Sequence, residues 1–145
     1  MKSSTKTYFS SDGFYSSGFL NLTPREAFAE VHSNAIIVDV REEYLIGFKL
    51  FDVPNIIYLP NSQLESRFHE LPLDKPLIIA DSVGLRSKEA MLFLANKGYL
   101  SIANLSGGIV DWERDGLPLV IDVKEKLDGS CACQLKPRNR IKKQL

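Results

Sequence analysis

Cysteine is almost missing from this 145-residue chain: the only two, Cys131 and Cys133, stand one residue apart near the C-terminal end. Two thiols at that spacing do not make a disulfide framework, so the fold needs an ordinary apolar core. Long apolar runs are missing too, since none approaches the roughly 20 residues of a membrane span. The N-terminal stretch also lacks the continuous apolar segment of a secretory signal. These absences predict a cytoplasmic protein without membrane contact.

A net charge is missing as well, but the charges are unevenly spread. The chain has 18 basic and 18 acidic residues. No acidic residue follows Asp128, whereas five basic residues do, so residues 1–128 carry a charge near −5 and the remainder near +5. A basic tail of this kind is typically solvated, although it also suits an acidic partner. We expect a small anion or a protein partner that is acidic or relays sulfur, and no nucleic acid.

The apolar pattern predicts strands that alternate with helices. The stretch TPREAFAEV has a strong helix start, because Thr23 suits the N-cap, Pro24 the first helical position and Glu26 the capping box. The runs AIIVDV and PLIIA are almost continuously apolar, as in strands that are buried on both faces. We predict strands over 19–22, 35–40, 55–60, 76–80 and 101–105, and helices over 23–31, 62–71, 86–98 and 107–116.

This alternation predicts a three-layer α/β fold, a doubly wound parallel sheet of about five strands with helices on both faces. We place this domain over residues 19–122, after a loosely held N-terminal arm over 1–18 and before a basic tail over 123–145. In such sheets, ligand sites form beyond the carboxyl ends of the strands. Polar residues follow two of the predicted strands there, at Asp39–Arg41 and at Asp81–Arg86.

The stretch DSVGLRS, residues 81–87, has the chemistry of an anion-binding loop. It follows a buried strand and enters a predicted helix, whose N-terminal N–H groups attract negative charge. Gly84 permits the backbone conformation in which several N–H groups converge, and the guanidinium of Arg86 can add bidentate donors. The predicted anion-binding loop consists of Ser82, Val83, Gly84, Leu85, Arg86 and Ser87, with Asp81 at its mouth.

Between about residues 20 and 120 the sequence resembles single-domain rhodanese-like proteins. The resemblance rests on IIVDVRE, VPNIIYLP, DSVGLRS and the closing motif NLSGGIVDWERDGLP. It implies a doubly wound α/β domain whose active loop runs from a catalytic Cys to an Arg, with backbone N–H groups around a persulfide sulfur. When Gly84, Arg86 and Ser87 are matched to that loop, the catalytic position falls on Asp81.

Two features depart from the family pattern. The carboxylate of Asp81 cannot form the persulfide that sulfur transfer requires, although it can accept hydrogen bonds from the loop N–H groups and pair with Arg86. The family's Gly-His pair falls on Phe51 and Asp52, in a segment after Arg41 that is longer than usual. We therefore predict a catalytically degenerate domain, a binding or regulatory module with a remnant of the anion loop.

Other residues near the predicted site are assigned supporting roles. The resemblance implies that Asp39 and Arg41 organise structure around the loop, and we expect Arg41 to serve as a second anion contact. The loop serines lack a neighbouring base, since His32 and His69 fall near predicted helix ends. We see no carboxylate cluster for Mg²⁺ and expect no cofactor and no resident metal in the domain. A phosphatase of the related fold is excluded, because no Cys precedes the Arg and the loop has the shorter sulfurtransferase length.

The alternative is a sulfurtransferase or sulfur carrier of the same family in which Cys131 or Cys133 carries the persulfide. Nearby Lys and Arg residues favour the thiolate form, and the basic tail would deliver the sulfur. The same pair also offers two ligands to a soft metal such as Zn²⁺ or Cu(I), with a second chain completing the site. The simplest interpretation is an inert, exposed pair on a solvated tail.

Overall fold

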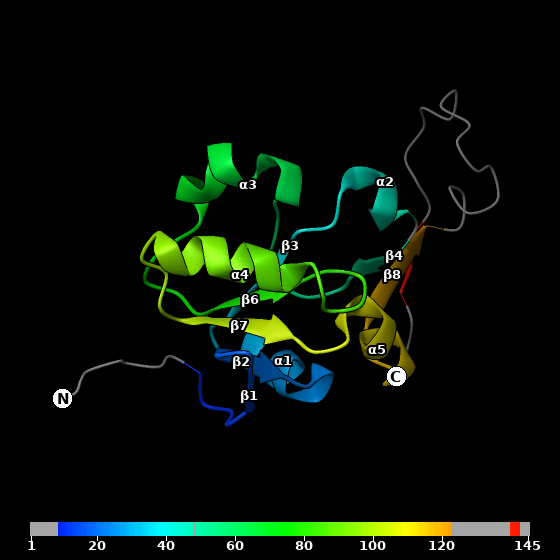
Figure 1. Ribbon diagram of the computed structural model, residues 1–145. Helices are drawn as coiled ribbons and strands as arrows, with labels where there is room; N and C mark the ends of the chain where they lie inside the picture. The colour runs from blue at the N-terminus through cyan, green and yellow to red at the C-terminus, as the bar shows by residue number, and fades with distance from the viewer. Residues whose placement is uncertain (1–8, 48, 123–139, 143–145) are drawn as a thin grey trace.

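Six strands form the central sheet of the protein, in a computed structural model that describes residues 9–47, 49–122 and 140–142 (Figure 1). Their order across the sheet is β1-β2-β7-β6-β3-β5. β1 is antiparallel to β2, and every other neighbouring pair is parallel. The strands are β1 (Phe14–Ser16), β2 (Phe19–Leu22), β3 (Ile36–Asp39), β5 (Ile56–Tyr58), β6 (Leu77–Ala80) and β7 (Ile102–Leu105).

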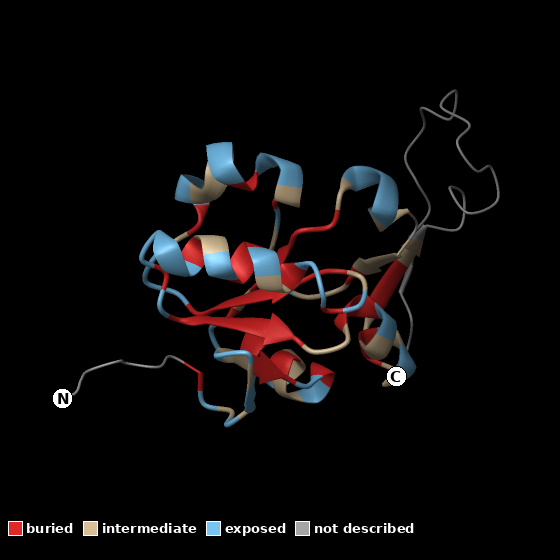
Figure 2. Ribbon diagram, in the orientation of Figure 1, coloured by how far each residue is buried: buried red, intermediate tan, exposed pale blue. Residues whose placement is uncertain are grey.

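Helices cover both faces of this sheet, which confirms the predicted three-layer α/β fold (Figure 1). On one face Ile78 packs in a cluster with Trp112, and on the other Ile79 packs with Met91. Consecutive residues of one strand enter opposite cores because side chains alternate across a strand, and the central strands are buried (Figure 2). The helices are α1 (Pro24–Val31), α2 (Glu43–Ile46), α3 (Asn61–Arg67), α4 (Ser87–Asn96) and α5 (Gly108–Arg114), with a 3₁₀ turn η1 (Phe68–Glu70) after α3.

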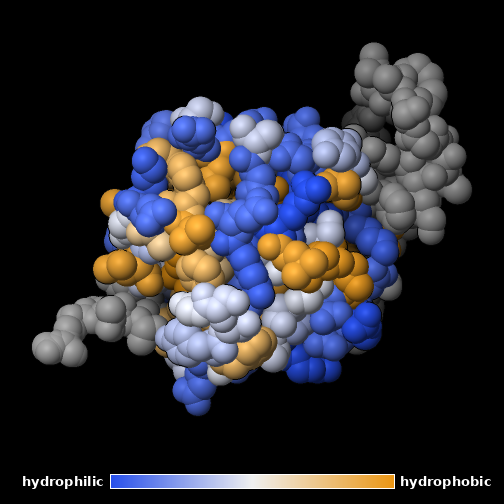
Figure 3. All heavy atoms as spheres, viewed as in Figure 1, coloured by the Kyte–Doolittle hydropathy of each residue, from blue (hydrophilic) through white to orange (hydrophobic). Residues whose placement is uncertain are grey.

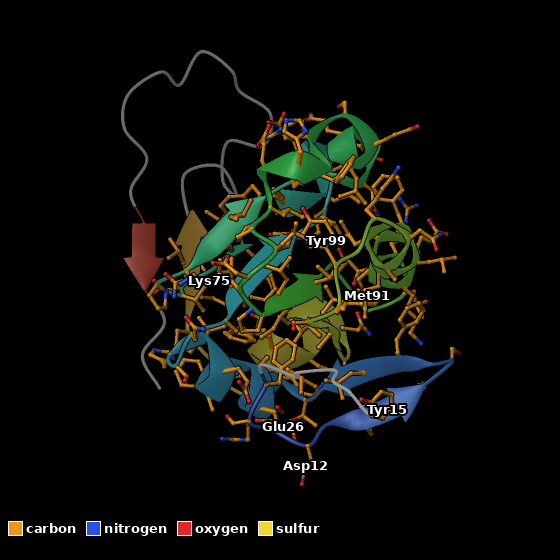
Figure 4. The ribbon with its side chains drawn as sticks, turned by 90° about the vertical axis from the view of Figure 1, so that its left-hand side faces the viewer. Asp12, Tyr15, Glu26, Lys75, Met91 and Tyr99 are labelled. Carbon is orange, nitrogen blue, oxygen red and sulfur yellow. The ribbon has the colours of Figure 1, made fainter. Side chains whose placement is uncertain are left out.

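Helix α1 begins with the capping box that its sequence predicts. The N–H of Glu26 donates to Thr23 Oγ1 at 3.2 Å, and the N–H of Thr23 donates to Glu26 Oε1 at 3.0 Å. The second carboxylate oxygen of Glu26 accepts from the N–H of Gly13 at 3.3 Å. The cap therefore also holds the chain that leads into β1. Figure 4 shows Glu26 on the α1 side of the sheet and Met91 on the α4 side.

A second sheet, which the sequence analysis does not predict, lies near α2 and α5 (Figure 1). Its strands β4 (Lys49–Phe51), β8 (Leu119–Asp122) and β9 (Arg140–Lys142) are antiparallel. β9 lies in the segment that we expected to be a tail, and β1 in the one that we expected to be an arm. Phe9, in that same arm, is buried in the core. The division of the chain into arm, domain and tail stays a prediction, and Cys131 and Cys133 lie outside the described residues.

The helices in the described part of the chain are short. The longest helix in the described part of the chain, α4, has 10 residues. Across the described ranges, none of the helices has the length and apolar character that a bilayer crossing demands.

Candidate functional site

The loop between β6 and α4 lies at the carboxyl end of the parallel strands, where ligands bind in sheets of this kind. β6 ends at Ala80 and α4 begins at Ser87, so residues 81–86 form the loop. β3 ends beside it, because Asp39 is the partner of Ala80 in the register of the two strands. The fold therefore brings together the two polar segments that the sequence analysis selects.

The carboxylate of Asp81 fills the centre of the loop. Its side chain is buried, with the residue 4% exposed. Oδ1 accepts a hydrogen bond from the N–H of Gly84, and Oδ2 accepts from the N–H of Arg86 at 2.7 Å and of Ser87 at 3.2 Å. These donors stand at the N-terminus of α4, where the helix dipole also favours negative charge. The predicted hydrogen bonds from converging N–H groups are thus present, and the acceptor is the loop's own side chain.

The predicted ion pair between Asp81 and Arg86 is wrong. Within the described residues, the Arg86 guanidinium forms no ion pair with Asp81 or with any other carboxylate. Arg86 is exposed, whereas Asp81 is buried and already accepts three backbone hydrogen bonds. Arg86 therefore stabilises Asp81 through its backbone N–H and leaves its charged end at the surface.

The start of α5 holds the loop from the other side. The N–H of Ile109 donates to the carbonyl of Asp81 at 2.9 Å, and that of Val110 donates to the carbonyl of Ser82 at 3.1 Å. Gly108 makes this approach possible: its φ is +60°, and a Cβ there would lie 2.4 Å from backbone atoms of Ser82. The closing motif of the sequence is therefore a clamp on the loop, as well as a core element.

A buried amide network, which sequence reasoning missed, supports the loop from the sheet. Ser87 Oγ donates to Asn104 Oδ1, and Asn104 Nδ2 donates to the Gly84 carbonyl at 3.3 Å and to Asn21 Oδ1 at 2.7 Å. Asn21, Asn104 and Ser87 are all at most 2% exposed. The signal was an Asn inside each of two apolar strand segments, FLNL and SIANL, because a buried amide needs specific partners. Ser87 thus has a structural partner.

Asp39 and Arg41 form the buried structural pair that we predicted. Arg41 Nη2 donates to Asp39 Oδ2 at 2.7 Å and Arg41 Nε to Asp39 Oδ1 at 3.0 Å. Nη2 also donates to the Lys49 carbonyl at 3.1 Å, and the guanidinium lies 5.6 Å from the centre of the Phe51 ring. The pair therefore ties the end of β3 to β4, in the segment that departs from the family pattern.

A cavity of about 230 Å³ opens beside Asp81. Its polar lining includes the side chains of Arg86, Asn61 and Ser82, none of which is hydrogen-bonded to another side chain among the residues described. Val83 and Leu85 are exposed, so the loop contributes them to the surface. This volume is below that of typical pockets for drug-sized ligands and fits a small anion or a single side chain.

The histidines and the tryptophan take no part in this site. His32 and His69 are exposed, and the ring of His32 is hydrogen-bonded to the Phe28 carbonyl at 2.9 Å. Trp112 is fully buried, and its Nε1 donates to the Pro118 carbonyl at 2.8 Å. No group of three or more His, Cys, Asp or Glu residues that would suit a metal ion occurs in the described ranges.

Comparison with known proteins places the whole loop inside a recognised domain. The sequence model of the family described as Rhodanese-like domain matches residues 23–115. A protein named sulfurtransferase from Allochromatium vinosum is 34% identical over 87 residues, which cover 60% of this chain and 79% of that protein. The thiosulfate sulfurtransferase GlpE of Pseudomonas syringae pv. syringae is 29% identical over 94 residues, which cover 65% of this chain and 87% of that protein.

A solved structure with a related name has a similar fold. The crystal structure of a rhodanese-related protein from Thermoplasma volcanium superimposes with a TM-score of 0.63 at 29% identity, and it covers 69% of this chain and 96% of that one. Residues 23–115, which match the sequence model of the family, include the β6–α4 loop and the start of α5 that is hydrogen-bonded to it.

Proposed function

The chain belongs to the family of rhodanese-like domains, and we propose that it is a member without ordinary sulfurtransferase activity, which acts as a binding or regulatory module. The single observation that carries this proposal is the position of Asp81. Its carboxylate accepts the three loop N–H groups at the N-terminus of α4. By the family resemblance, this is the place of the nucleophilic sulfur.

A carboxylate at this point lacks the chemistry of sulfur transfer. A persulfide forms on a thiolate, which accepts a sulfane sulfur and passes it on. Asp81 has no sulfur, and the described domain contains no other thiol. The fixed negative charge also opposes an anionic donor such as thiosulfate at the centre of the loop, where the N–H groups already bind Asp81, since like charges within a few ångströms repel. Both arguments predict a loop that folds correctly but does not transfer sulfur.

The same site can still bind a negatively charged ligand. The guanidinium of Arg86 is exposed at the mouth of the loop and has no carboxylate partner among the described residues. A partner that brings its own negative charge would pair with Arg86 without displacing Asp81. The ligand in this proposal is a small anion or an acidic protein, met in the cytoplasm.

The proposal is tested with the purified full chain, thiosulfate and cyanide. An active thiosulfate sulfurtransferase is measured in parallel as the standard, and thiocyanate is the product that is counted. We expect no thiocyanate above the enzyme-free background. A rate comparable to that of the standard would overturn the proposal.

A second candidate function places the sulfur on Cys131 or Cys133, which lie outside the described residues. It is supported by the names of the relatives, which are sulfurtransferases, and by the lack of any other thiol in the chain. The test is mass spectrometry after treatment with thiosulfate, whose outer sulfane sulfur passes to the Cys thiolate while sulfite leaves. A mass increase of one sulfur that is lost in the double variant Cys131→Ser, Cys133→Ser would favour the carrier, and an unmodified wild type would exclude it.

A further inference from the structure

Two cavities meet at the mouth of the β6–α4 loop and make one groove. The first, of about 230 Å³, contains Arg86 in its lining, and the second, of about 260 Å³, is lined by Ile109 and Val110 of α5. Arg41, Leu45 and Ser82 line both. We call the combined feature the α2 groove, because α2 forms one of its walls while the loop and α5 form the other.

The edges of the α2 groove are unusually apolar. Leu45 of α2 is 43% exposed, Val83 of the loop 50% and Val110 of α5 45%, and each of the three lines at least one of the two cavities. Figure 3 shows hydrophobic surface gathered over the β6–α4 loop. Single exposed apolar residues are ordinary, whereas apolar residues from three segments around one opening mark an interaction surface. A free inorganic anion would leave all of this surface uncovered.

The charged residues that line the α2 groove favour a negatively charged ligand. The acidic groups that line it are engaged: both oxygens of Glu42 accept from Ser62, at 2.9 and 2.7 Å, and both oxygens of Asp81 accept from loop N–H groups. Glu113 pairs with Lys49 at 2.5 Å. Arg86 is the lining cation that has no acidic partner in the ranges the structure describes. Guanidinium groups of this kind bind carboxylates in bidentate fashion.

We infer that the α2 groove docks a segment of a partner protein that presents one carboxylate between apolar side chains. The carboxylate binds Arg86, within reach of the donors of Asn61 and Ser82 that line the same cavity. The flanking apolar side chains cover Leu45, Val83 and Val110. This inference rests on the proposed function, because it names the class of partner that binds the same degenerate site. The partner is a protein segment because only a segment covers both the Arg86 guanidinium and the apolar edges of the groove.

The test begins with a displayed library of random heptapeptides, selected on the full chain. Selected peptides should carry an Asp or Glu with an apolar residue on each side. One such peptide is then synthesised with its acidic residue intact and with the matching amide, Asn or Gln. Its affinity is measured by fluorescence anisotropy for the wild type, Arg86→Gln, Val83→Ser and the control Arg25→Gln, whose exposed arginine on α1 is outside the lining of the groove.

We expect Arg86→Gln and the amide peptide each to weaken binding by about tenfold or more, since a charge-assisted hydrogen bond contributes about 1.5–3 kcal/mol. Combined, the two changes should cost no more than either alone. Val83→Ser should weaken binding, and Arg25→Gln should not. A library without binders, binders without an acidic residue, or affinities that Arg86→Gln leaves unchanged would overturn the inference. Each of these results leaves the thiocyanate assay unaffected, so the two proposals fail separately.

Discussion

The backbone N–H of Arg86 donates to the carboxylate of Asp81 at 2.7 Å, while the guanidinium of the same Arg86 stays exposed at the surface. One residue thus serves the loop in two ways. Its backbone helps to hold the buried negative charge at the N-terminus of α4, and its side chain remains available to a ligand. The Asp81 carboxylate therefore fills the centre of the loop, and the Arg86 guanidinium leaves a positive charge at its surface. This arrangement is the physical basis for proposing that the domain binds a ligand instead of transferring sulfur.

Asp81→Asn should destabilise the domain by about 1–3 kcal/mol. The amide keeps one acceptor oxygen, so at least one of the three N–H groups that now bind the carboxylate loses a buried partner. Urea unfolding followed by circular dichroism measures the change. The control is Ser82→Ala, a half-buried residue of the same loop, which should stay within about 0.5 kcal/mol. Equal midpoints for both variants would contradict the role given to Asp81.

Asn104→Ala should destabilise the fold by about 2–3 kcal/mol. The substitution leaves Ser87 Oγ, the Gly84 carbonyl and Asn21 Oδ1 without their buried amide partner, and each unsatisfied group costs about 1–3 kcal/mol before relaxation. Asn96→Ala, at the exposed end of α4, is the matched control. A similar urea midpoint for the two variants would show that the network contributes nothing beyond an ordinary surface amide.

Gly108→Ala should be far more damaging than Gly98→Ala. Both glycines have a positive φ, which costs an alanine about 1–2 kcal/mol. A Cβ on Gly98 meets open space, whereas one on Gly108 meets backbone atoms of Ser82 at 2.4 Å. The expected cost at position 108 is more than about 3 kcal/mol, because the clamp between α5 and the loop must open. Equal thermal stability of the two variants would contradict the clamp.

Tyr99 should make the domain less stable at alkaline pH. Burial raises the pKa of its hydroxyl, which donates to the carbonyls of Leu71 at 2.7 Å and Phe68 at 2.9 Å. The unfolded chain releases the proton near pH 10, so stability falls as the pH rises from there through the higher folded pKa. In urea titrations, the stability advantage of the wild type over Tyr99→Phe should shrink above about pH 10. A stability advantage that stays constant as the pH rises above about 10 would contradict the role given to the buried Tyr99 hydroxyl.

The parallel core of this fold could be predicted because its signals are local. The capping box at Thr23 and the apolar runs of β3 and β6 each depend on a few adjacent residues. The strands β1, β4, β8 and β9 are as short as the strands that were predicted, so their length does not explain why they were missed. Antiparallel pairing decides them, and the partner can be distant: β4 pairs with β8, some seventy positions away in the chain.

The site was predicted in outline and corrected in detail. The structural role of Asp39 and Arg41 could be inferred from the family resemblance, which implies that these two positions organise structure around the loop. The contact of Asp81 was assigned to the Arg86 guanidinium, whereas the backbone supplies it, because sequence alone does not show which way a side chain leaves a helix start. Asn104 was missed because its partners Ser87 and Asn21 lie 17 and 83 positions away.

The central claim is that Asp81 disables sulfur transfer and that the second departure from the family pattern, at Phe51 and Asp52, does not, and Asp81→Cys tests it most directly. The variant places a thiol among the N–H groups of Gly84, Arg86 and Ser87 and removes the fixed charge. Thiocyanate formation from thiosulfate and cyanide is measured for the wild type, for Asp81→Cys and for Asp81→Ser as the thiol-free control. The account predicts activity in Asp81→Cys only. Activity in the wild type, or a folded Asp81→Cys variant as inactive as Asp81→Ser, would contradict it.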